Sequence, residues 1–337
     1  MQSKIQRRSF LKTVSGVTAA SLVTPLLSSC RTSTQNTNAS TWSCSSNSTA
    51  YETIISIGGL SEPVSVLQIA DSHITYTNET DKEYEQFSAR MAGAYANTKH
   101  YSTGEPTTPI DSFMELITLA QKENVDMIAL TGDIVNFPSA TAVSLIMETM
   151  AASGIPFVYT AGNHDWHYEG MDGSATELRR AWCNNRLKPL YQGSNGLYAS
   201  RIVGGINMVT IDNSTYQVDD EQLEFYRQQA QRPEPIALFM HIPLYMPGMN
   251  ICCGHPQWGY ATDKIYEIER RQRWPESGNQ PSTAAFVDQV MNTEKLAGIF
   301  VGHWHQIRVI TSRGKNQYLT GAAYNGQHRL IRFIPSV

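Results

Sequence analysis

Side chains that can bind metal ions are grouped in five motifs, each directly after a short apolar run. The motifs are Asp71-Ser72-His73, Gly132-Asp133, Gly162-Asn163-His164-Asp165, His241 and Gly302-His303-Trp304-His305. Imidazole nitrogens with carboxylate and amide oxygens favour Mn, Fe or Zn over Ca, because imidazole is too soft a ligand for calcium. Two divalent cations held close together need a shared anionic oxygen, and Asp133 is the natural bridge. The motifs therefore predict a centre of two divalent metal ions.

The apolar runs predict the strands that position these motifs. They cover residues 64–70, 125–130, 156–160, 236–240 and 297–301. Runs of this length that end at turn residues are typical of strands buried on both faces. Ligands of α/β sheets bind beyond the carboxyl ends of the strands, so we expect the five motifs to meet at one edge.

Helices are predicted between the first three strands. Thr108 is a candidate N-cap with Pro109 at the first helical position, and Ser139 and Gly154 are candidate ends of the next helix. The order strand, helix, strand, helix, strand predicts an α/β fold with a largely parallel sheet and right-handed crossovers.

The second half of the chain predicts a hairpin that turns at Gly204-Gly205 and a long insertion over residues 245–281. We expect this insertion to influence substrate choice, with Arg270, Arg271 and Arg273 as candidate phosphate contacts. The remaining predicted elements are helices over residues 219–231 and 282–291 and closing strands over residues 308–312 and 317–320.

The first 30 residues predict an export signal rather than a folded element. Arg7-Arg8-Ser9-Phe10-Leu11-Lys12 resembles a bacterial twin-arginine signal, and Leu27-Ser28-Ser29-Cys30 resembles a lipoprotein box in which Cys30 is lipidated. The apolar stretch 14–27 is shorter than the roughly 20 residues that a transmembrane helix needs. We therefore expect a membrane-anchored lipoprotein of the bacterial cell envelope, periplasmic or otherwise outside the cytoplasm.

The rest of the chain divides into a linker and one catalytic domain. Residues 31–50 are rich in Ser, Thr and Asn and predict a flexible linker, so that folding begins near Tyr51 and the domain covers residues 51–337. The composition of the whole chain, 41% hydrophobic and 17% charged, is that of a globular protein. Export permits disulfides, but the sequence leaves the pairing open for the four cysteines outside the lipoprotein box, which are Cys44, Cys183, Cys252 and Cys253.

The net charge argues against nucleic acid as a partner. The whole chain has a formal net charge of −4, and residues 1–30 contain four basic residues and no acidic one, so their removal leaves −8. A protein that grips a phosphate backbone needs a basic surface to release counterions. Affinity for phosphate would have to come from bound metal ions instead.

Together, and in this order, the five motifs resemble those of the calcineurin-like metallophosphoesterase superfamily, over about residues 64–321. The resemblance implies two packed mixed β-sheets flanked by helices, in a four-layer sandwich. It assigns Asp133 to both metal ions and divides the other ligands between them, with Asp71, His73 and His305 on one ion and Asn163, His241 and His303 on the other.

The resemblance also implies how a small phosphoester would be hydrolysed. A metal-bridging hydroxide would attack phosphorus in line, and His164 would contact the phosphate and protonate the leaving oxygen, with Asp165 orienting the imidazole. Purple acid phosphatases have a tyrosine three residues after the bridging aspartate, where this chain has Asn136, so that branch is disfavoured. Phosphodiesters and phosphomonoesters both stay open as substrates. The alternative is a catalytically silent envelope binding protein on the same scaffold; the sequence does not settle the oligomeric state.

Overall fold

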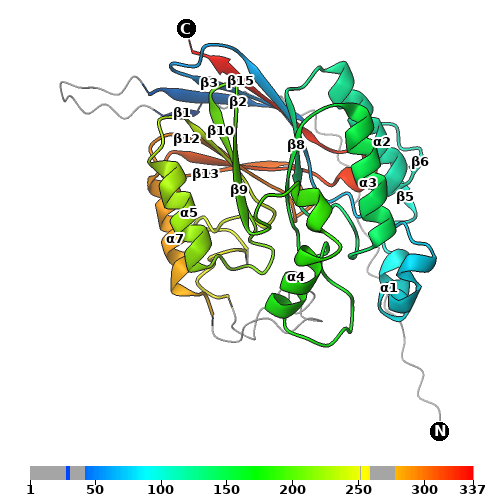
Figure 1. Ribbon diagram of the computed structural model, residues 1–337. Coiled ribbons are helices and arrows are strands. Elements are labelled where there is room, and N and C mark those ends of the chain that lie inside the picture. The colour runs from blue at the N-terminus through cyan, green and yellow to red at the C-terminus, as the bar shows by residue number, and fades with distance from the viewer. Residues whose placement is uncertain (1–27, 31–41, 251, 259–277, 337) are drawn as a thin grey trace, which may run out of the picture.

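Two mixed β-sheets form the centre of the protein (Figure 1). The computed structural model describes residues 28–30, 42–250, 252–258 and 278–336. In spatial order, the first sheet contains β1 (Ser28–Cys30), β2 (Cys44–Ser48), β3 (Glu52–Ile57), β15 (Arg329–Pro335), β4 (Val64–Ile69), β7 (Met127–Thr131) and β8 (Phe157–Thr160). The second contains β13 (Arg308–Ser312), β14 (Lys315–Leu319), β12 (Leu296–Val301), β11 (Ile236–Phe239), β10 (Ile206–Ile211) and β9 (Tyr198–Val203).

Helices flank the pair of sheets on opposite sides, with α2 and α3 on one side and α5 and α7 on the other (Figure 1). Their bounds are α2 (Pro109–Lys122), α3 (Ala140–Ser153), α5 (Asp220–Ala230) and α7 (Pro281–Asn292). The predicted α/β fold of two packed mixed sheets flanked by helices is thereby confirmed. Shorter elements complete it: η1 (Glu79–Tyr84), α1 (Glu85–Ala92), β5 (Thr98–Lys99), β6 (Pro106–Thr107), α4 (Ala175–Asn184), η2 (Lys188–Tyr191) and η3 (Ala323–Asn325).

Capping residues set the ends of the helices between β4, β7 and β8 as predicted. The Thr108 side chain accepts a hydrogen bond from Asp111 N–H at the start of α2, and Ser139 accepts one from Ala142 N–H at the start of α3. Gly154 ends α3 with a φ of 70°, which glycine adopts without strain. The helices return the chain so that β4, β7 and β8 are parallel neighbours.

The core between the sheets explains why the site-bearing strands are continuously apolar. β7, β11 and β12 are buried along their whole length. Side chains from both sheets join in one cluster, in which Phe239 stacks on Phe300 and Phe300 on Tyr318, each pair with ring centroids 5.1 Å apart. Phe300 also contacts Phe333 of the first sheet, with ring centroids 6.3 Å apart, so aromatic packing joins the two sheets. The strand ends are therefore a rigid base for side chains.

Two strands of the first sheet differ from the sequence prediction. Residues 44–48, predicted as part of the flexible linker, form β2, which pairs antiparallel with β3 on one side and β1 on the other. Its residues alternate between half-buried and exposed and none is fully buried, so it is held mainly by backbone hydrogen bonds. β15, which was not predicted, lies between β3 and β4. Residues 1–27 and 31–41, with most of the export signal and linker, lie outside the described residues.

Two loop residues near the site, Tyr168 and His255, are buried. Trp258 of the insertion is buried, whereas Arg270, Arg271 and Arg273 lie outside the described residues. No disulfide joins the described cysteines, which are free thiols: Cys44, Cys183, Cys252 and Cys253.

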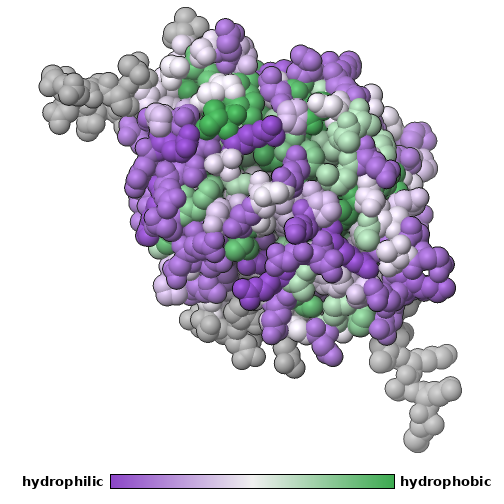
Figure 2. All heavy atoms as spheres, viewed as in Figure 1, coloured by the Kyte–Doolittle hydropathy of each residue, from purple (hydrophilic) through white to green (hydrophobic). Residues whose placement is uncertain are grey.

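The face drawn in Figure 2 is mostly hydrophilic, with hydrophobic residues showing near the upper end of the sheets and over α3. None of the helices in the described part of the chain is long and apolar enough to cross a membrane.

Candidate metal centre

The strands that precede the five motifs have their carboxyl ends at one place, and all five motifs lie there. Three motifs follow β4, β7 and β8 of the first sheet, and two follow β11 and β12 of the second. Backbone hydrogen bonds join these loops to one another: Asp71 N–H donates to Gly132 O at 3.0 Å, His73 N–H to Asp133 O at 2.8 Å and Gly302 N–H to His241 O at 2.9 Å. The loops therefore hold each other in position.

A buried glutamine joins the two sheets beneath these loops. Gln68 Nε2 donates to Thr131 Oγ1 at 3.0 Å and to Val301 O at 3.3 Å, and Gln68 Oε1 accepts from Thr320 Oγ1 at 2.6 Å. Buried amides whose donors and acceptor are all paired specify one arrangement of their neighbours. The motifs of the two sheets are in this way kept in one relative position.

Backbone strain is concentrated at the metal-binding motifs. Nine described non-glycine residues have positive φ, and five of them are candidate ligands: Asp71 (57°), His73 (45°), Asp133 (51°), His303 (69°) and His305 (52°). This conformation is uncommon outside glycine and persists only where the surrounding structure enforces it, as it does at functional sites. The strain directs side chains from separate loops toward one point.

Glycines in the motifs make room for the carboxylates. A Cβ at Gly162 would overlap the Asp133 carboxylate, and one at Gly302 would lie 2.5 Å from Asp71 Oδ2. Contacts that close do not occur, so a side chain at either position would displace an aspartate. Glycine is needed here for close approach of the loops.

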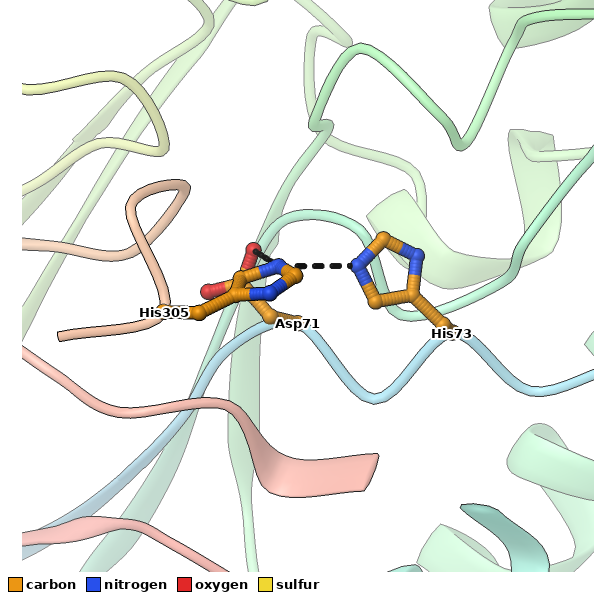
Figure 3. A group of neighbouring side chains, drawn as sticks. All are labelled: Asp71, His73 and His305. Carbon is orange, nitrogen blue, oxygen red and sulfur yellow. Dashed lines mark hydrogen bonds and ion pairs between the residues drawn. The ribbon is translucent and has the colours of Figure 1, made fainter. Parts of the chain in front are cut away.

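The first ligand group contains Asp71, His73 and His305, which point toward one another (Figure 3). His305 Nε2 is 3.4 Å from Asp71 Oδ1 and 3.2 Å from His73 Nε2. The Asp71 carboxylate also accepts the backbone N–H of His303 at 2.9 Å. One oxygen and two ring nitrogens thus surround a common point, as a metal ion requires.

The second ligand group contains Asp133, His241 and His303, and Asn163, the fourth predicted ligand, lines the same cavity as Asp133 and His303. Asp133, His241 and His303 bring their ligand atoms within 4.8 Å of one another. His241 Nδ1 is 2.9 Å from Thr131 O and so carries the proton, which leaves Nε2 free to act as a ligand. That Nε2 is 3.2 Å from Asp133 Oδ2, and the same oxygen is 3.9 Å from His73 Nε2. Asp133 therefore lies between the two groups.

The described residues fit divalent metal ions. Asn163 Oδ1 and His241 Nε2 are buried and have no hydrogen-bond partner in the described structure. Burying polar atoms unpaired costs about 1–3 kcal/mol each, which a coordinated cation would offset. The donors are imidazole nitrogen, carboxylate oxygen and amide oxygen, a set suited to Mn, Fe or Zn. Asp133 belongs to two of the three candidate ligand groups, one with His241 and His303 and one with His73 and His164.

The family of the chain follows from comparison with known proteins. Residues 64–307 match the model of the calcineurin-like phosphoesterase family. The chain belongs to this family. This phosphoesterase is also 23% identical over 212 residues to a Fibrobacter succinogenes protein named as a probable cyclic nucleotide phosphodiesterase, with 62% of this chain and 69% of the relative covered.

A solved structure shows the same fold. A dimetal phosphatase from Danio rerio superposes with a TM-score of 0.50 and 12% identity over 80% of this phosphoesterase and 92% of the zebrafish chain. The family consists of metal-dependent phosphoester hydrolases, and that is the enzyme class of this chain. The division of ligands between the ions and the roles of single residues were predicted from the sequence and remain predictions.

The residues around His164 differ from the sequence prediction. Asp165, expected to orient the His164 imidazole, instead accepts the backbone N–H groups of Val135 at 2.8 Å and Gly162 at 2.7 Å. It joins two loops of the phosphoesterase and does not contact the imidazole. The partner of His164 Nδ1 is Asn136, through its side-chain oxygen at 3.2 Å and its backbone oxygen at 3.3 Å.

The Asn136 amide is itself held in one orientation. Its Nδ2 donates to Met91 O at 2.8 Å and to Thr75 Oγ1 at 3.2 Å, so Oδ1 faces His164. Two acceptor oxygens at Nδ1 fix the proton there and direct the other ring nitrogen away from Asn136. The residue that marks the difference from purple acid phosphatases is thus the one that orients His164.

The charges of the site shift its pKa values in opposite directions. Burial alone would lower the pKa of His241, but the Asp133 and Asp71 carboxylates outweigh burial and raise it to about 10. Burial, with His164 nearby, lowers the pKa of His73 well below its ordinary value. Burial and the Asp133 charge raise the pKa of Asp165 to about 7. Titratable groups with separated pKa values in one cleft are typical of catalytic sites.

Sequence reasoning missed two tyrosines beside the ligands. Tyr216 OH lies 2.7 Å from His303 Nε2, and its ring stacks on Trp258 with centroids 4.2 Å apart. Tyr95 stacks on His73 with centroids 4.0 Å apart. Tyr216 follows β10, another apolar run that ends in polar residues, which was a usable signal. Tyr95 lies in a polar segment with no such signal.

Proposed function

We propose that this phosphoesterase binds two divalent metal ions, one at each ligand group with Asp133 shared, and hydrolyses small phosphoesters. The position of Asp133 carries this proposal, because its Oδ2 is within 3.9 Å of histidine nitrogens from both groups. The Asn163 oxygen supports it, since it is a buried acceptor without a hydrogen-bond partner in the described structure, which a cation would satisfy.

Metal ions at this centre would act as Lewis acids on the phosphoryl group and lower the pKa of water to provide a nucleophile. The residues of the chain supply orientation and proton transfer. Asn136 holds the proton on His164 Nδ1, so Nε2 is the atom that donates a proton to the leaving alcohol. Asp165 fixes the loops that carry Asp133 and His164 through its two backbone hydrogen bonds.

The ester class is tested by hydrolysis of matched substrates. Similarity to a probable cyclic nucleotide phosphodiesterase supports phosphodiesters, whereas the dimetal centre serves monoesters equally well. The Mn²⁺-loaded protein would be assayed with 4-nitrophenyl phosphate and with bis(4-nitrophenyl) phosphate. A higher kcat/KM for the bis-ester identifies a phosphodiesterase, and a higher kcat/KM for the monoester identifies a phosphatase.

The same assay tests the proposal against its alternative. Metal content near two ions per chain with no turnover of either ester would favour a catalytically silent binding protein. Hydrolysis that persists unchanged in Asp133→Asn would contradict a shared aspartate. His164→Asn separates the roles, because it should lower kcat while leaving the metal content intact.

We also propose that the enzyme is exported and anchored to the membrane of the bacterial cell envelope. The support is the twin-arginine-like segment at residues 7–12 and the lipoprotein box that ends at Cys30. Labelled palmitate should be incorporated into the wild-type protein and not into Cys30→Ser, and the enzyme should fractionate with membranes. Recovery of the unlabelled wild-type protein in the cytoplasm would contradict export.

A further inference from the structure

A cavity of about 380 Å³ opens beside the ligand groups, and an ion pair lies on its wall. Arg90 comes from α1 and Glu169 from the loop that follows β8. Arg90 Nε donates to Glu169 Oε2 at 2.6 Å, and a second contact joins Arg90 Nη2 to Glu169 Oε1. The pair is therefore a two-point interaction, in which geometry is fixed as well as charge.

The two partners differ in exposure. The Glu169 side chain is only 7% exposed, whereas that of Arg90 is 71% exposed. A buried carboxylate thus holds an exposed guanidinium against the cavity wall. Among the described residues that line the cavity, Arg90 is the only arginine, and there is no lysine. Its charge is already balanced by Glu169.

Arginine binds phosphate through the same pair of parallel N–H groups with which it binds a carboxylate. A second phosphate of a substrate would have to compete with Glu169 for Arg90 and would be repelled by that carboxylate. A neutral polar group has no such cost, because guanidinium N–H groups donate to hydroxyl and ring acceptors, and carboxylate oxygens accept from hydroxyl and ring N–H groups.

We propose that the Arg90–Glu169 pair determines substrate specificity. The cavity takes the uncharged, hydrogen-bonding organic group of a substrate with a single phosphoryl group, as in a nucleoside or sugar phosphoester, and disfavours a second anionic group. Met91, Ala94 and Tyr95 supply the less polar wall against which this group packs. The inference rests on the proposed hydrolysis of small phosphoesters and names their class.

The test compares thymidine 5′-phosphate with thymidine 3′,5′-bisphosphate as competitive inhibitors of nitrophenyl ester hydrolysis at fixed ionic strength. The wild-type enzyme should bind the bisphosphate no more tightly than the monophosphate. Glu169→Gln keeps the side-chain shape and removes the competing charge. Its ratio of inhibition constants should shift by about tenfold toward the bisphosphate, the effect of one charge-assisted hydrogen bond.

Two further variants assign the shift to Arg90. Arg90→Gln, at an exposed position, should shift the ratio the other way because the carboxylate is left unpaired in the cavity. Glu169→Gln/Arg90→Gln should bring the ratio back to near the wild-type value. An unchanged ratio in Glu169→Gln, or a shift that survives in the double variant, would overturn the proposal.

The design separates this inference from the proposed function. The ratio of two inhibition constants within one variant cancels changes common to both nucleotides, and calorimetric titration of the metal-loaded protein measures the same ratio without turnover. Absence of hydrolysis with the expected binding ratios would count against the proposed function alone. Hydrolysis with a wild-type preference for the bisphosphate would count against the specificity role alone.

Discussion

The two ligand groups differ in how their histidines are held. In the second group, each imidazole is fixed through its other nitrogen, His241 by Thr131 O and His303 by Tyr216 OH. In the first group, His73 Nδ1 is buried with no hydrogen-bond partner among the described residues, and the His305 side chain is 27% exposed. Such outer contacts orient ligands and raise their basicity. The second group is therefore the better prepared for a metal ion.

Protonation of His241 opposes metal binding at the second group. The carboxylates that orient His241 also raise its pKa to about 10, so this imidazole must lose a proton before it can bind a metal ion. The pKa of His73 is well below its ordinary value, so it is neutral and ready to bind. In the second group His241 is fixed and protonated, whereas in the first group His73 is neutral and less constrained. Burial lowers the pKa of His305, the other histidine of the first group, but the Asp71 carboxylate outweighs burial and raises it.

The largest expected effect is that of replacing Asp133, the residue that the two ligand groups share. Asp133→Asn removes the shared charge, so both ions should bind weakly and kcat/KM should fall by about 10³-fold or more, as expected for several kcal/mol of transition-state stabilisation. Metal analysis and nitrophenyl ester hydrolysis measure the two effects. Asp172→Asn, at an exposed position, is the matched control. Loss of only one ion would show that Asp133 belongs to a single group.

Replacing one histidine in each group ranks the groups directly. His241→Ala should lower the affinity of the tighter ion by about 100-fold or more, since it removes a ligand rather than a supporting contact. His305→Ala should affect only the weaker ion. Calorimetric titration with Mn²⁺ resolves the two steps. Equal losses of the tighter ion in both variants would mean that the second group is not the better prepared.

The contribution of the outer contacts is measured at Tyr216. Tyr216→Phe removes the hydroxyl beside His303 and should weaken the tighter ion by about tenfold, the lower end of the range for such contacts. Tyr226→Phe is a matched control, because it removes a buried hydroxyl that contacts Thr293, away from the motifs. Equal affinity in Tyr216→Phe and the control would assign the Tyr216 contact to packing.

The smallest expected effect is the release of protons when a metal ion binds at the second group. Because the pKa of His241 is raised, it is protonated at neutral pH, and binding at the second group should release about one proton per ion. Affinity there should fall as pH decreases and rise about tenfold per unit as pH increases toward 10. Titration in buffers of different ionisation enthalpy counts the protons. Release of protons only at the first group would reverse the assignment.

The sequence correctly predicted the elements whose formation depends on a few neighbouring residues. The motifs, the strands before them and the capped helices were predicted because apolar runs, turn residues and N-caps act over a few residues. β15 was missed although residues 329–335 carry an apolar pattern. β2 could not be found in this way, because a serine-rich strand is stabilised by its neighbours and not by its own side chains.

The roles of residues inside the site were harder to predict from the sequence. Asp165 follows His164 directly, and adjacency suggested a contact that the loop geometry does not make. Asn136 reaches His164 only because β7 and β8 are parallel neighbours and their loops lie side by side. Contacts between loops depend on tertiary structure, which no local pattern encodes.

The place of β15 has a consequence for the order of assembly during synthesis. β3 and β4 are close in sequence but are separated in the sheet by Arg329–Pro335, which forms a parallel ladder with one and an antiparallel ladder with the other. Until the ribosome has made these residues, β2–β3 and β4–β7–β8 are two unjoined pieces with open edges. Long-range pairing of this kind is slow and leaves such edges exposed to aggregation. These edges thus stay open until Arg329–Pro335 has emerged and paired with both pieces.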